Sequence, residues 1–195
     1  MKAYKGFKSE KSGTAYPQLP AGAYVAAIQN VKIVGTEPDQ QLVLRLEIIE
    51  GEWAGYFTKR YQNDASGSGK YEVKYKGDME LQIPNDDNHD RQHPEWDERT
   101  FNNFIYCIQA SNPGYTWDWK ENGLKGKTIG VSAREEVWNG NTFTKLRRLE
   151  VADDVRQGLV KPLRPKTDNS SLPQNTPAET TTDGFTMVET EELPF

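Results

Sequence analysis

The chain has 195 residues, of which 24 are Lys or Arg and 29 are Asp or Glu, giving a formal charge of -5. Hydrophobic residues make up 35% of it, enough for one domain core, but no run of about 18 apolar residues exists, so we expect no transmembrane helix. The single Cys107 excludes a disulfide framework and a cysteine-rich zinc site, and we expect no secretory signal because no apolar segment follows Met1.

The first half of the chain predicts β-strands. Residues 22–34 are rich in Val, Ile, Ala and Tyr, and residues 41–50 alternate between apolar and polar side chains, as strands with one buried face do. Gly51 and Glu52 then predict a tight turn into a third strand over residues 53–62. Further strand is predicted within residues 71–83.

The second half predicts one helix and two more strands. Apolar residues within 94–110 recur at helical spacing, Pro94 suits the first turn, and residues 112–114 (Asn-Pro-Gly) end the helix. Residues 127–138 and 142–151 alternate as strands do, and the Asn-Gly-Asn sequence between them predicts a tight hairpin.

This order predicts a mainly β protein with an OB-fold-like five-stranded Greek-key barrel and one helix between strands 3 and 4. A generic antiparallel sandwich is the alternative. We expect a basic N-terminal arm over residues 1–20, the barrel domain over 21–163 with an insertion at 63–96, and a disordered acidic tail over 164–195 that ends in a docking tip at 189–195.

The charge is segregated along the chain. Residues 167–195 carry six acidic and no basic residues, and residues 78–98 carry eight acidic residues against one arginine. The rest of the chain has a net charge of +8. Because the local potential decides which ligand a surface attracts, the overall negative charge does not exclude a nucleic acid.

Aromatic and cationic residues are interleaved on the predicted strands. This combination is typical of proteins that bind single-stranded nucleic acid, in which cations follow the phosphates and aromatic rings stack on bases. Half-exposed Tyr and Trp residues are also common in ordinary sheets, so the recurrence of the pattern is what favours binding. The candidate DNA-binding residues are Tyr56, Lys59, Arg60, Arg134, Trp138, Lys145 and Arg147.

Evidence for catalysis is weak. Residues 86–93 hold both histidines, His89 and His93, with several carboxylates, so a metal-dependent nuclease is one alternative and a solvated acidic loop is the other. No glycine-rich phosphate loop occurs, and Cys107 lies on the apolar side of the predicted helix as a buried structural thiol would. We therefore expect no enzymatic activity, no cofactor and no resident metal.

The C-terminus ends in carboxylates followed by Leu-Pro-Phe and resembles the acidic tip of bacterial single-stranded DNA-binding proteins. Phe195 could fill an apolar pocket while its α-carboxylate pairs with a basic group, and Pro194 reduces the entropy lost on docking. The resemblance implies that the tip recruits partner enzymes. The candidate partner-binding residues are Glu191, Glu192, Leu193, Pro194 and Phe195.

The body resembles a family of phage-encoded single-stranded DNA-binding proteins from replication and recombination cassettes. The stretches that carry this resemblance are 19–24 (Leu-Pro-Ala-Gly-Ala-Tyr), 51–57 (Gly-Glu-Trp-Ala-Gly-Tyr-Phe), 111–119 (Ser-Asn-Pro-Gly-Tyr-Thr-Trp-Asp-Trp) and 124–127 (Leu-Lys-Gly-Lys). The resemblance implies an OB-like protein that coats and protects single strands in the cytoplasm of a host cell. It leaves the oligomeric state open, a homo-oligomer included.

Two other functions remain as alternatives. The acidic residues of 78–98 and the tail could mimic the charge of DNA, so that the protein binds a host DNA-processing enzyme without binding DNA. The other alternative is the metal-dependent nuclease at residues 86–93. No membrane partner is expected.

Overall fold

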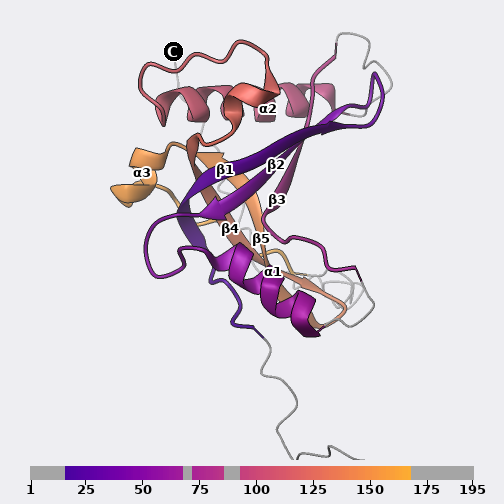
Figure 1. Cartoon of the computed structure of the whole chain (residues 1–195), viewed down its shortest axis with the longest axis vertical. Helices are drawn as coiled ribbons and strands as arrows, with labels where there is room; N and C mark the ends of the chain where they lie inside the picture. Colours follow the sequence, from indigo (N-terminus) through magenta and orange to yellow (C-terminus); the bar gives the residue numbers. More distant parts are fainter. Residues whose placement is uncertain (1–15, 68–71, 86–92, 168–195) are drawn as a thin grey trace, which may run out of the picture.

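The computed structural model describes residues 16–67, 72–85 and 93–167. Its elements, shown in Figure 1, follow in chain order: β1 (Gly22–Val34), β2 (Gln41–Ile48), α1 (Tyr56–Gly67), β3 (Asp78–Gln82), α2 (Pro94–Ala110), the 3-10 helix η1 (Glu121–Leu124), β4 (Thr128–Trp138), β5 (Asn141–Glu150) and α3 (Ala152–Arg156). The predicted arm up to residue 15, the acidic loop at 86–92 and the tip at 189–195 lie outside the described residues.

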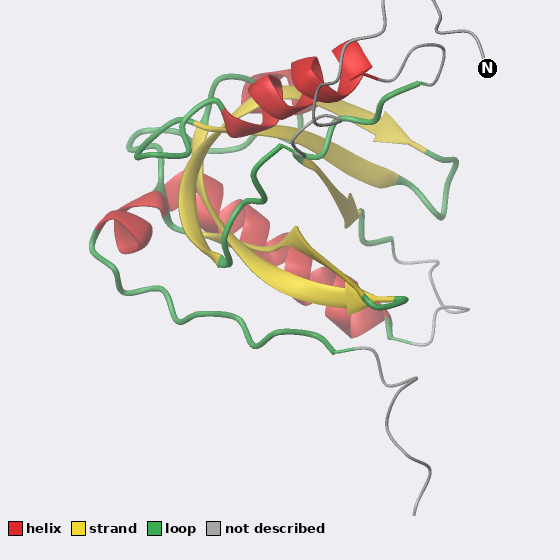
Figure 2. Ribbon diagram, turned by 90° about the horizontal axis from the view of Figure 1, so that it is seen from below, coloured by secondary structure: helices red, strands yellow, loops and turns green. Residues whose placement is uncertain are grey.

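The five strands form one antiparallel sheet in the order β3-β2-β1-β4-β5. Figure 2 shows that this sheet is strongly curved. The mainly β fold and the helix between strands 3 and 4 are therefore confirmed, but the predicted barrel is not closed. β3 and β5 are the two edges of the open sheet.

The core lies on the face of the sheet that α2 covers. Strand β2 points Leu42, Leu44, Leu46 and Ile48 inward, as its alternation predicted, because side chains two apart share a face. α2 packs against β3, β4 and β5 and adds a buried stripe at helical spacing. The buried residues of that stripe are Phe101, Phe104, Cys107 and Ile108.

The prediction of a strand over residues 53–62 is wrong, because this segment turns at Gly55 and continues as α1. Gly55 has a φ of 76°, a left-handed conformation that glycine adopts without strain. The first turn of α1 is capped from a distance by Glu47 of β2, whose carboxylate accepts hydrogen bonds from the backbone amides of Phe57 (3.0 Å) and Thr58 (2.7 Å). A carboxylate at this position accepts hydrogen bonds from N–H groups that have no partner within the helix, and its negative charge interacts favourably with the helix dipole.

The third strand of the sheet is β3, which is shorter than the strand predicted over 71–83. The chain enters it through Gly77, whose carbonyl accepts a hydrogen bond from the amide of Leu46 (2.9 Å). A Cβ at this position would lie only 2.8 Å from the Phe57 ring and 2.4 Å from the Leu46 oxygen. Glycine therefore allows α1 and β3 to approach β2 together.

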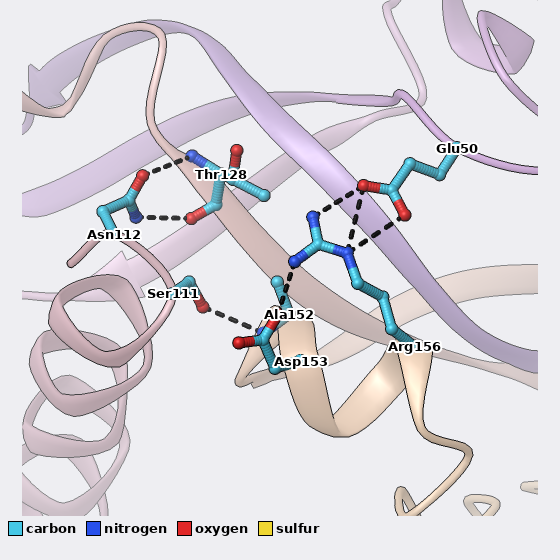
Figure 3. Close-up of polar contacts among 7 residues, drawn as sticks. All are labelled: Glu50, Ser111, Asn112, Thr128, Ala152, Asp153 and Arg156. Atoms are coloured by element: carbon cyan, nitrogen blue, oxygen red, sulfur yellow. Dashed lines mark hydrogen bonds and ion pairs between the residues drawn. The ribbon is translucent and has the colours of Figure 1, made fainter.

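Polar contacts fix the C-terminal end of α2 to the sheet, as Figure 3 shows. The Asn112 side chain donates to the Thr128 carbonyl (2.7 Å) and accepts from the Thr128 amide (3.0 Å), and the Ser111 hydroxyl accepts from the Ala152 amide (2.9 Å). Arg156 of α3 pairs with Glu50 just after β2. In Figure 1, α2 lies across one end of the sheet and α1 lies near the other.

The chain after α3 returns along the sheet. Lys166 makes two backbone hydrogen bonds with β4: its carbonyl accepts from the Val137 amide and its amide donates to the Glu135 carbonyl, both at 2.9 Å. The predicted tail boundary at residue 164 is therefore too early, because residues up to 167 belong to the described fold. Among the described helices, none combines the length and the apolar character needed to cross a membrane.

Candidate nucleic-acid interface

Two adjoining pockets lie between the two edge strands of the open sheet. The first has a volume of about 490 Å³ and the second about 300 Å³. They share Met79, Thr100 and Arg147, and we name their combined surface the β3–β5 groove. The first pocket is lined by Met79, Arg99, Thr100, Asn103, Arg134, Arg147, Arg148, Leu149 and Leu163, and the second by Lys76, Asp78, Met79, Glu80, Leu81, Thr100, Lys145, Leu146 and Arg147.

The groove is positively charged. Its two acidic residues are Asp78 and Glu80, and Asp78 is paired through both carboxylate oxygens with Arg45 at 2.9 Å. The first pocket has no acidic residue in its lining. Six cationic side chains line the groove, which are Lys76, Arg99, Arg134, Lys145, Arg147 and Arg148. Arg134 and Arg147 are paired with Glu136, and Arg148 is paired with Glu150. A concave surface with an excess of cationic over acidic lining residues still concentrates anionic ligands.

Glu136 holds two of the groove arginines in place. Arg147 is the extra residue of a bulge in β5, between Leu146 and Arg148, and it donates to both carboxylate oxygens of Glu136 at 2.6 and 2.5 Å. Arg134 donates to the same carboxylate at 2.9 Å. Glu136 is only 6% exposed, and its hydrogen bond with Arg147, followed by that with Arg134, lowers its pKa to about 2.

This pairing positions the guanidinium groups without using their full hydrogen-bonding capacity. A guanidinium has five N–H donors, and one carboxylate cannot accept all of them from two arginines. Fixed arginines lose less conformational entropy when they bind a phosphate than freely rotating side chains do. The arrangement can therefore bind anionic groups at defined positions.

The floor of the groove is apolar. Met79 of β3 and Leu149 of β5 are buried there, and Leu163 lines it from the segment that follows α3. That segment is tied to β5 through Arg148, which donates to the Lys161 carbonyl at 3.2 Å. On the other side, Asn103 of α2 donates to the Leu149 carbonyl at 2.9 Å. An apolar floor with cationic walls matches a ligand that has flat apolar faces and negative charge.

Some of the predicted DNA-binding residues come together here. Arg134, Lys145 and Arg147 all line the groove, and Arg134 and Lys145 are paired across β4 and β5. Trp138 lies at the end of β4 on the same face as Arg134 and Glu136, because these residues are separated by even steps. Its side chain is 64% exposed, although it lines neither of the two pockets.

Three predicted residues lie elsewhere, on α1. Tyr56 is 2% exposed, and its hydroxyl accepts from the Leu19 amide and donates to the Pro17 carbonyl. The prediction that Tyr56 stacks on a base is wrong, because its ring is part of the core. Arg60 donates a hydrogen bond to the Tyr56 hydroxyl (3.0 Å). Lys59 is exposed, and its amine donates a hydrogen bond to the Ala54 carbonyl (3.0 Å). Neither lines the groove.

Three groove residues are not among the predicted DNA-binding residues: Arg99, Arg148 and Lys76. Arg99 directly follows the acidic stretch 78–98 and lies on a helix, where only the orientation of α2 turns it towards the groove. Arg148 lies just after the bulge, and the bulge shifts the strand register by one residue. Lys76 stands beside Tyr75, an aromatic and cationic pair of the kind that predicts a nucleic-acid surface.

Other reactive groups of the described chain do not form a site. Among the described residues no cluster of three His, Cys, Asp or Glu side chains could hold a metal ion, and most of the predicted cluster at 86–93 lies outside them. Cys107 is buried, as predicted, with its thiol on the Leu149 carbonyl, and burial raises its pKa to about 12. A thiol of this kind is a poor nucleophile at neutral pH.

Comparison with protein-family models finds no family that matches the chain, and comparison with curated proteins finds no matching relative. The residues of the β3–β5 groove and their arrangement are therefore the basis for a functional conclusion.

Proposed function

We propose that the protein binds single-stranded DNA in the β3–β5 groove. The observation that carries this proposal is the convergence of six cationic side chains from α2, β4, β5 and the segment before β3 on one apolar-floored groove. Phosphates would contact the arginines and lysines, while bases would pack on the partly exposed Leu163 that lines the first pocket. Trp138 extends the surface with an exposed ring at the end of the hairpin.

The topology supports an OB-like assignment. In the curved sheet, β3 and β5 are the edges, so pairing between them would close a five-stranded barrel. An OB-fold is a partly open barrel of five strands with a known capacity for oligonucleotides on the strand 2–3 face. The groove lies between β3 and β5, where these two strands would pair with each other in a closed barrel.

The preference for single strands follows from the apolar floor. Bases in a duplex are stacked and paired, so they cannot lay a face on Leu163 or on the exposed Trp138 ring, whereas bases of a single strand can. Duplex DNA would interact only through its phosphates and would gain nothing from the floor. The protein would coat and protect transient single strands during phage DNA replication or recombination.

A second part of the proposal concerns partner enzymes. The tip residues Glu191 to Phe195 combine carboxylates with a terminal aromatic residue, a composition that suits a basic rim around an apolar pocket. We propose that the tip recruits replication or recombination enzymes. This part is supported by the sequence alone, since the tip lies outside the described residues.

A titration of fluorescent oligo-dT and of a matched duplex, at two salt concentrations, tests DNA binding. We expect single strands to bind more tightly than duplex, with an affinity that falls as salt rises, because each neutralised phosphate releases counterions. Absence of binding at low salt would contradict the proposal, as would equal affinity for the two forms.

A further inference from the structure

Three aromatic rings that all contact one another lie beside α2, and we name them the aromatic cluster. Phe101 of the helix packs on Trp117 with ring centroids 5.6 Å apart, and Trp117 stacks on Trp119 at 4.9 Å with an angle of 27° between the rings. Phe101 and Trp119 are 6.2 Å apart at 23°. Trp117 is also fixed by its indole N–H, which donates to the Lys120 carbonyl at 3.2 Å. Trp119 therefore packs against two rings, of which Trp117 is itself fixed by a hydrogen bond.

Trp119 is both strained and exposed. Its φ is 65°, a left-handed conformation that is a true outlier for a bulky side chain, and it is 70% exposed. Burial of this side chain cannot explain the strain, because most of its surface is in water. Strain of this kind persists where the surrounding structure imposes it, and it is concentrated at binding sites.

Residues of the same helix, α2, belong to the aromatic cluster and to the β3–β5 groove. Arg99, Thr100 and Asn103 of α2 line the groove, whereas Phe101 belongs to the aromatic cluster. Phe101 and Asn103 are two residues apart, so their side chains point about 160° away from each other around the helix axis. The groove and the aromatic cluster therefore lie on different sides of the same helix.

Three lysines lie on the connection between α2 and β4 that carries Trp119. Lys120 follows Trp119 directly and is largely exposed while paired with Asp118 at 3.1 Å. Lys125 is exposed on the same connection between α2 and β4, and Lys127 lies over the Tyr115 ring at 4.3 Å. Phosphates on either side of a stacked base would find positive charge here.

We propose that Trp119 stacks a base of the strand that occupies the β3–β5 groove and continues across α2. Trp119 is thus a second contact point that lengthens the binding site. This inference rests on the proposed function, because it assigns a further residue to the same ligand. The Trp119 ring is already packed on Phe101 and Trp117 and is largely exposed, so it could stack on a base without any rearrangement of the side chain.

The experiment compares oligo-dT of about 6 and about 16 nucleotides, lengths within the range that one OB-fold covers. Trp119→Gly removes the ring and also relieves the positive φ, and Trp119→Phe keeps a stacking ring. Thermal unfolding of each variant shows whether the fold is retained. We expect Trp119→Gly to weaken the long strand about 5- to 150-fold, the value of one base stack, and to leave the short strand unchanged. Trp119→Phe should restore most of the loss.

Three results would overturn the inference. They are unchanged affinity of Trp119→Gly for the long strand, an equal loss for both lengths, and a loss that Trp119→Phe does not restore. An equal loss would mean that Trp119 only supports the fold or the groove. If the unmodified protein binds neither strand, the proposed function itself fails, and this result differs from all three.

Discussion

At the scale of single residues, Glu136 links the stability of the fold to the geometry of the groove. Its carboxylate is almost fully buried and holds Arg134 and Arg147 by hydrogen bonds. Those bonds require the ionised form, so the pKa of Glu136 in the folded protein, about 2, lies below its ordinary value of 4.5. Acid should therefore weaken both the fold and the positions of the two arginines.

The sign of the pH dependence follows from this lowered pKa. The contribution of Glu136 is fully present above pH 4.5 and is lost as the pH falls towards 2. Glu136→Gln keeps the shape of the side chain but removes the charge. We expect this variant to be less stable at pH 7 by about 1 kcal/mol, because charge-assisted hydrogen bonds to half-exposed arginines are replaced by neutral ones.

Urea unfolding at pH 7, 4.5 and 3 measures the effect. The difference in unfolding free energy between wild type and Glu136→Gln should shrink as the pH falls through this range. A difference that stays constant from pH 7 to pH 3 would show that Glu136 does not titrate as described. Glu135→Gln is the matched control, because Glu135 is exposed on the same strand.

At the scale of elements, α1 shows why part of the fold could not be predicted. Residues 53–62 have an alternating pattern, but Tyr56 with Arg60 and Phe57 with Tyr61 also have the four-residue spacing of a helix. What decides between the two is Glu47, which is distant in sequence and caps the helix through the Phe57 and Thr58 amides. Short apolar segments are ambiguous when such a tertiary contact is unknown.

Several other elements depend on local signals, and their prediction is confirmed, whereas η1 and α3 were not predicted. The Asn-Gly turn of the β4–β5 hairpin, the Pro94 start of α2 and the inward leucines of β2 all follow from the sequence. The same holds for the groove: Arg134 and Lys145 could be placed by strand alternation, whereas Arg148 depends on a bulge and Arg99 on helix packing. Neither a register shift at a bulge nor the orientation of a packed helix can be recognised from the local sequence.

Replacing Glu47 by Gln tests this account of α1. The buried carboxylate also accepts from the Tyr75 hydroxyl at 3.1 Å, so the change weakens several hydrogen bonds together. We expect a loss of about 2 kcal/mol in unfolding free energy, in the range of a lost helix cap with a buried partner. Glu52→Gln, an exposed change just before α1, should leave stability within about 0.5 kcal/mol of wild type.

The measurement is urea unfolding followed by circular dichroism. If Glu47→Gln and Glu52→Gln had the same stability, the capping role of Glu47 would be refuted.

At the scale of the whole molecule, the chain after α3 has two parts with opposite expected effects. Residues 161–167 supply Leu163 to the groove and hydrogen-bond to β4, whereas residues 168–195 carry six carboxylates that compete with phosphate for cations. Removal of 168–195 should leave oligo-dT binding intact or make it tighter. Removal of 161–195 should weaken it, because one wall of the groove is lost.

A smaller deletion isolates the tip. Without residues 187–195 the protein loses Glu189, Glu191 and Glu192, so single-strand binding should be unchanged or tighter while capture of partner enzymes is lost. Oligo-dT titrations of the three truncated chains measure the effects on DNA. Markedly weaker binding after removal of 187–195 or 168–195 alone would contradict this division.

The central claim is that the β3–β5 groove, rather than the cationic surface in general, binds the strand. Lys145→Glu reverses a charge in the groove, and Lys59→Glu makes the same change on the exposed face of α1. In oligo-dT titrations, we expect Lys145→Glu to weaken binding about tenfold and to reduce the salt slope by about 0.7, the value of one lost phosphate contact, with little effect of Lys59→Glu. Equal losses for the two variants, or no loss for Lys145→Glu, would contradict the account.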